Sequence, residues 1–163
     1  MRRRFLVLLT TAATLAACTT ELAYRPQTPD GRTIEMQQAQ SVAGTGWDMR
    51  DTLDYSLPRL HGKYDCVVTV RTGGDYPYRD LTFLAQLCDE KRHISHSRIL
   101  TVPIYNDADN SLGHGIPFAE HDIAINDLQL DSAHTYTLRL AHRMRKECLP
   151  GIPDVSIRLM QAQ

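Results

Sequence analysis

The sequence lacks the patterns that mark most catalytic and nucleic-acid-binding proteins. It contains no Gly-x-Ser-x-Gly nucleophile elbow, no glycine-rich phosphate loop and no His-Glu-x-x-His zinc motif. Basic residues are not in excess either, because 18 Lys and Arg stand against 19 Asp and Glu, a net charge of −1. A protein that binds nucleic acid needs a basic face. The sequence therefore predicts neither an enzyme nor a nucleic-acid-binding protein.

Complete sets of metal ligands are also missing. The 7 histidines show no spacing that resembles a zinc site. Asp107, Asp109 and Ser111 match the first three ligand positions of a calcium loop. However, Leu112 stands where such a loop needs glycine, and Phe118 stands where it needs a bidentate glutamate. We expect no metal and no cofactor, and a loose calcium site in this loop is the alternative left open.

Long apolar runs are absent except near the start of the chain, where residues 5–17 follow Arg2, Arg3 and Arg4. This run is shorter than the roughly 20 residues that a membrane-spanning helix needs, so it predicts a cleaved signal peptide. It ends in Leu-Ala-Ala-Cys, which is typical of a lipoprotein signal, with Cys18 as the lipidated residue. The alternative is an ordinary secretory signal followed by a chance cysteine. Removal of residues 1–17 leaves 15 Lys and Arg against 19 Asp and Glu, so the mature chain carries about −4. We expect this mature chain to be tethered to a membrane by its lipid.

Cysteines are few, and Cys18 is assigned to the lipid. The three others, Cys66, Cys88 and Cys148, would lie in a compartment that permits disulfides. Cys66 is expected to face the core, because it shares one face of a predicted strand with valines. If a bridge forms, Cys88 with Cys148 is the favoured pair, and three free thiols are the alternative.

Helical periodicity is almost absent, and one ambiguous patch near residues 139–147 is the exception. Apolar and polar residues alternate instead in short runs, which is typical of half-buried strands. The runs cover residues 53–57, 64–71, 81–87, 99–105, 121–125, 134–141 and 155–159. Pro103 favours an edge or a bulge for the fourth run. This spacing predicts an all-β fold, a single-domain antiparallel β-sandwich that is jelly-roll-like.

The segment between the signal peptide and the first predicted strand is polar and contains Pro26 and Pro29. It shows neither helical nor strand periodicity before residue 34. We therefore expect three parts: a signal peptide at 1–17, a lipidated flexible tether at 18–40 and the β-sandwich domain at 41–163.

One unusual stretch, residues 71–81, contains a glycine turn followed by Tyr76, Pro77, Tyr78 and Arg79. Proline holds the backbone extended, so this corner could present two aromatic rings to a partner. We predict an interaction surface made of Tyr76, Tyr78 and Arg79, joined by Arg145 if its turn lies at the same end of the sandwich. The alternative is that the tyrosines cover the end of the core.

Several blocks together resemble the GldH-type gliding-motility lipoproteins. They are residues 71–81, the Gly113-His114-Gly115 loop, and residues 144–155 with Leu149-Pro150-Gly151-Ile152, besides Trp47 and the lipoprotein signal. The sequence departs from the family pattern at Asp80, where asparagine is usual, and at Leu112, where tryptophan is common.

This resemblance implies an envelope-anchored accessory of the gliding machinery, or its counterpart in bacteria that do not glide. It implies no catalytic residues. We expect a non-catalytic structural component that is attached through its lipid, most simply at the outer membrane, and that contacts other envelope or motility-complex proteins. The alternative function is a glycan-binding module, because exposed tyrosine rings stack on the apolar faces of sugars.

Overall fold

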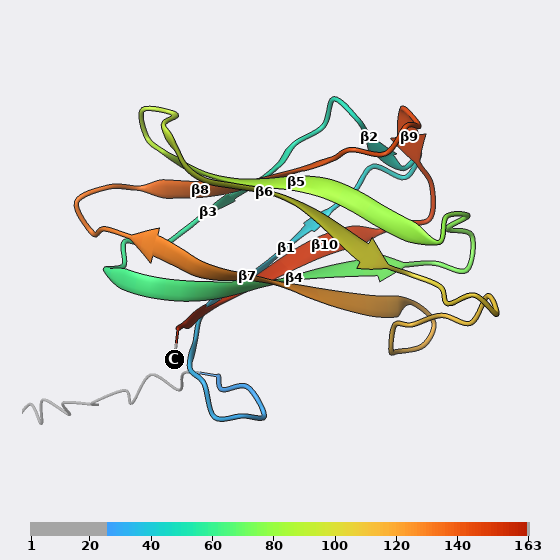
Figure 1. Cartoon of the computed structure of the whole chain (residues 1–163), viewed down its shortest axis with the longest axis horizontal. Coiled ribbons are helices and arrows are strands. Elements are labelled where there is room, and N and C mark those ends of the chain that lie inside the picture. Colours follow the sequence, from blue (N-terminus) through green and yellow to red (C-terminus); the bar gives the residue numbers. More distant parts are fainter. Residues whose placement is uncertain (1–25, 163) are drawn as a thin grey trace, which may run out of the picture.

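The computed structural model describes residues 26–162, which form two antiparallel four-stranded sheets packed face to face (Figure 1). The predicted signal peptide and Cys18 lie outside the described residues. The strands are β1 (Ile34–Ser41), β2 (Trp47–Asp48), β3 (Leu53–Ser56), β4 (Gly62–Thr72), β5 (Asp80–Asp89), β6 (Ile94–Pro103), β7 (Ala119–Leu130), β8 (Tyr136–His142), β9 (Cys148–Leu149) and β10 (Asp154–Gln161).

The order of the strands is that of a jelly roll. One sheet has the order β1-β10-β4-β7, the other has the order β3-β8-β5-β6, and β2 pairs with β9 in a small separate ladder. The predicted all-β antiparallel sandwich is confirmed. Within residues 26–162 there is no helix, so the ambiguous patch at 139–147 is the end of β8 and the loop that follows it. Accordingly, none of the described residues belongs to a helix that could cross a membrane.

The core lies between the two sheets and follows from the alternation of each strand. In β4, Cys66, Val68 and Val70 are all buried, as expected for the inward face. In the facing sheet, Tyr55 on β3 is also buried, and its hydroxyl donates a hydrogen bond of 2.7 Å to the carbonyl oxygen of Val155 on β10. This bond joins the two layers and satisfies a polar group inside the core.

The predicted tether was wrong at its C-terminal end. Residues 34–40 belong to β1, which pairs with β10 from Ile34 opposite Met160 to Ser41 opposite Asp154. The sandwich therefore begins before residue 41. The sequence does not predict this strand, because β1 is an edge strand whose side chains are all exposed or half-buried. Its stability comes from backbone pairing, which leaves little alternation in the sequence.

Cys66, Cys88 and Cys148 are free, so the favoured Cys88–Cys148 pair is not formed. Cys88 lies opposite Thr137 near the start of β8, whereas Cys148 lies beyond the other end of that strand. The distance along β8 from Thr137 to His142 is about 17 Å at the usual rise per residue. A disulfide requires Cα atoms within about 7 Å, so the fold keeps these two thiols apart.

The sandwich has two ends that differ in their loops. At one end, called the distal end below, five loops gather on the right of Figure 1. They cover residues 42–46, 73–79, 104–118, 143–147 and 150–153. At the opposite, proximal end, the described chain enters at residues 26–33, and the turns at 57–61, 90–93 and 131–135 lie there. The end at which the described chain enters the sandwich and the loop-rich end are therefore opposite each other.

Candidate functional site

Tyr76 belongs to the core of the distal end. Its side chain is 2% exposed, and its hydroxyl donates a hydrogen bond of 2.8 Å to the carbonyl oxygen of Asp80. Burial raises the pKa of this phenol. The prediction of an exposed ring was wrong for Tyr76, and the alternative, a side chain that covers the core, is what the structure has. The ring of Tyr78 packs edge-on against it, with 5.5 Å between the ring centroids.

Arg79 is exposed, but its guanidinium is held by the next loop. It forms an ion pair of 2.7 Å with Asp109, donates a hydrogen bond of 3.1 Å to the carbonyl oxygen of Asn106, and lies 3.5 Å from Asp107. The two aspartates are the ones that suggested a calcium loop, and an arginine lies between them instead. Residues 26–162 contain no group of three or more His, Cys, Asp or Glu that could hold a metal ion.

Tyr78 and Arg145 line one cleft of about 380 Å³ between the start of β5 and the loop after β8. Its other lining residues are Thr82, Arg143, Met144 and Lys146. Two of the four residues predicted for the interaction surface are thus brought together. Sequence reasoning missed the other cations, although the run Arg-Met-Arg-Lys at 143–146 was a visible signal. We call this the basic cleft.

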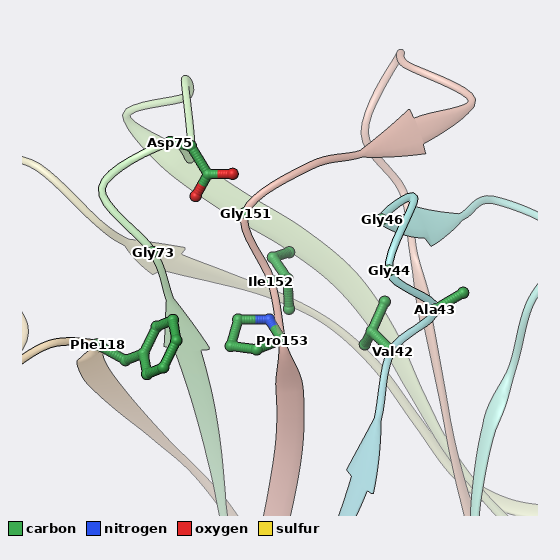
Figure 2. Close-up of a pocket in the computed structure, with 10 residues that line it drawn as sticks. All are labelled: Val42, Ala43, Gly44, Gly46, Gly73, Asp75, Phe118, Gly151, Ile152 and Pro153. Carbon is green, nitrogen blue, oxygen red and sulfur yellow. The ribbon is translucent and has the colours of Figure 1, made fainter.

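A second cleft, of about 300 Å³, opens between four segments of the distal end (Figure 2). Figure 2 shows apolar walls from Phe118, Pro153, Ile152 and Val42, with the carboxylate of Asp75 above them. Asp75 is the one charged side chain in its lining. A single carboxylate on otherwise apolar and backbone walls supplies no nucleophile paired with a base, so this cleft has no arrangement for catalysis.

The glycines of this second cleft allow its loops to pack closely. Gly151 has φ +75°, and a Cβ added there would lie 2.6 Å from the backbone nitrogen of Tyr76. The backbone N–H of Gly73 donates a hydrogen bond of 2.8 Å to the carbonyl oxygen of Gly151. Only glycine tolerates both the backbone angle and the close approach. A glycine at position 151 therefore lets this loop pack directly against the backbone of Tyr76.

Two histidines are buried at this end. His121 is 4% exposed, and its Nε2 lies 3.1 Å from the hydroxyl of Thr72. His142 is 1% exposed and packs edge-on against Trp47, with 5.6 Å between ring centroids. Burial lowers the pKa of both imidazoles, because it disfavours the charged form. A Cβ at Gly113 would meet the His121 ring at 2.6 Å, which explains a glycine there.

The family model of the GldH lipoprotein matches residues 35–159. The chain belongs to the GldH lipoprotein family. Membership confirms the resemblance read from the sequence and implies a lipid-anchored protein of the cell envelope that is associated with gliding motility. A comparison with curated proteins gave no match.

The blocks that carry the resemblance to the GldH lipoproteins meet in space. Residues 71–81, 113–115 and 144–155 are far apart in the sequence, yet all three reach the distal end. Part of each block maintains the fold, as Tyr76, Gly113 and Gly151 show. The third block also supplies Arg145 and Lys146, which are exposed and line the basic cleft.

Proposed function

We propose that this GldH-family protein is a non-catalytic accessory component of the gliding machinery, or of its counterpart in bacteria that do not glide. In this proposal, Cys18 is lipidated and holds the protein at the outer membrane, and the distal end contacts another envelope protein. The domain acts as a rigid support that presents the distal loops.

The main support is the placement of the loops relative to the chain entry. The described chain reaches the sandwich at the proximal end, where Ile34 pairs with Met160. In this proposal the lipid anchor precedes this point in the chain. The distal end, at the other end of the strands, then faces away from the anchor. Loops on a rigid scaffold are where binding residues concentrate, and the family blocks reach those loops.

The polar groups at the distal end also support a role without catalysis. Arg71 on β4 pairs with Asp154 on the neighbouring strand β10 at 2.8 Å, and Arg79 pairs with Asp109 of the next loop at 2.7 Å. His121 is a candidate base by residue type, but its side chain is buried and its Nε2 lies 3.1 Å from the Thr72 hydroxyl, which gives it a partner within the sandwich. These groups stabilise the end of the sandwich.

The glycan-binding alternative loses its main argument. It required Tyr76 and Tyr78 as an exposed aromatic pair, and Tyr76 is buried while Tyr78 is half-buried. A sugar-stacking platform needs an exposed ring face. Tyr76 and Tyr78 therefore do not form the exposed aromatic pair that sugar stacking requires.

The test is site-specific photo-crosslinking of the full chain in its native host. A photoreactive amino acid replaces Ile116, which is 98% exposed at the distal end. The matched control replaces Lys91, which is exposed in the proximal β5–β6 turn. We expect protein crosslinks from position 116 and few from position 91. Crosslinks from position 91 alone, or from neither, would contradict the proposal. Separation of the inner and outer membranes by density tests the location.

A further inference from the structure

The basic cleft has a half-buried floor that is fixed by the backbone on both sides. The backbone N–H of Thr82 donates to the sulfur of Met144 at 3.3 Å, and the N–H of Arg143 donates to the carbonyl oxygen of Thr82 at 2.8 Å. Tyr78 forms another part of the floor and rests on the buried ring of Tyr76. The floor is therefore preformed, so a ligand need not order it on binding.

The rim of this cleft carries three cations without partners. Arg143, Arg145 and Lys146 are exposed, and within the described part of the chain their side chains form no ion pair or hydrogen bond. By contrast, Arg50 and Arg71 at the same end are paired with carboxylates at 2.9 and 2.8 Å. Three unpaired cations beside an apolar floor favour a ligand that is both acidic and apolar.

We propose that the basic cleft binds an extended acidic segment of a partner protein. An apolar side chain of that segment lies on Met144 and Tyr78, and flanking carboxylates pair with Arg143 and Arg145, while Lys146 lies beside them in the lining of the cleft. This inference rests on the proposed function, because it names the chemistry of the contact made by the distal end.

A protein segment fits the cleft better than a membrane surface does. The cations line a concave site of about 380 Å³, and a concave site takes up a side chain, whereas a lipid surface requires a flat or protruding face. The cleft also lies opposite the end at which the described chain enters the sandwich. Arginine and tyrosine are among the residues that contribute most to protein interfaces, and arginine pairs bidentately with carboxylates.

The first experiment places the photoreactive amino acid at Lys146 in the full chain, in the native host, and maps the crosslinked segment by mass spectrometry. We expect a partner segment with at least two Asp or Glu and an apolar residue within a few positions of the crosslink. A segment without carboxylates, or an adduct with the mass of a lipid, would overturn the inference.

The second experiment tests charge with the probe still at Lys146. The pair Arg143→Gln and Arg145→Gln should lower the crosslink yield about fivefold, as expected for the loss of two exposed charge contacts. The matched control is Arg59→Gln with Arg98→Gln, which changes the net charge equally at exposed positions away from the cleft. An unchanged yield in the cleft variant, or an equal loss in both variants, would contradict the inference.

The probe at Ile116 separates the two proposals. If position 116 continues to crosslink to protein while position 146 gives no acidic segment, the distal end binds a partner but the basic cleft does not. If neither position crosslinks to protein, the proposed function itself fails, and this inference fails with it. Melting of the cleft variant should equal that of the control variant, because none of the four replaced side chains has a partner within the described residues.

Discussion

Replacement of Tyr76 tests whether the motif at 71–81 stabilises the fold. Tyr76→Ala removes a ring that is 2% exposed, and large-to-small replacements of buried aromatics cost about 3 to 5 kcal/mol. We use the lower end of this range, about 3 kcal/mol. A domain of this size is stable by roughly 5 to 15 kcal/mol. With a urea dependence of about 2 kcal/mol per M, the unfolding midpoint should fall by about 1.5 M.

The assay is urea unfolding, monitored by the fluorescence of Trp47. This residue is the single tryptophan of the chain and is buried at the same end. Tyr76→Phe keeps the ring but loses the hydrogen bond to Asp80, so we expect a loss of about 1 kcal/mol, or about 0.5 M. Tyr78→Phe is the matched control, because the Tyr78 hydroxyl has no hydrogen bond within the described residues. A midpoint for Tyr76→Ala that is equal to wild type would refute the burial argument.

Three further predictions concern the anchor, a glycine and the histidines. Cys18→Ala should abolish lipidation and release the protein from membranes, which detergent partitioning measures; unchanged partitioning would reject the lipoprotein assignment. Gly151→Ala should destabilise by at least about 1 kcal/mol in the same urea assay, because φ is +75° and the added Cβ meets the backbone of Tyr76 at 2.6 Å. Burial lowers the pKa of His121 and His142 from 6.5, so below that pH the unfolded chain binds more protons. The contribution of these two neutral histidines to the free energy of unfolding should therefore be fully present above pH 6.5. It should be lost as the pH falls toward their lowered pKa values. The urea midpoint should drop less between pH 7.5 and pH 5.5 in the double variant His121→Asn with His142→Asn than in the wild type. An equal drop in both proteins would show that other groups cause the pH dependence.

The structure separates two roles that the sequence left mixed in one motif. Tyr76 and Arg79 stand three positions apart in a stretch that predicted one interaction surface. Tyr76 points into the core, and Arg79 fastens the loop that contains Asp109. Tyr78, between them, lines the basic cleft. Whether each side chain is buried or exposed depends on which loops pack over it. Residue type alone does not predict that packing.

The sequence by itself determined the class of fold, the inward-facing residues of the inner strands and the family. Alternation is a local property, so it identifies strands such as β4 and β5, and Pro103 correctly suggested an edge, since β6 lies at the side of its sheet. Family blocks are also local, and the match over residues 35–159 agrees with them.

Only the tertiary structure decided which distant segments meet. β1 forms a strand because β10 lies beside it, and its own side chains alternate too weakly to reveal this. Cys88 and Cys148 stay apart because they lie at opposite ends of the sandwich. Arg145 and Tyr78 line one cleft because β8 and β5, which precede and follow them, are neighbours in one sheet. Pairing and burial arise from contacts between segments that are remote in sequence, and a local pattern of residues contains no information about those contacts.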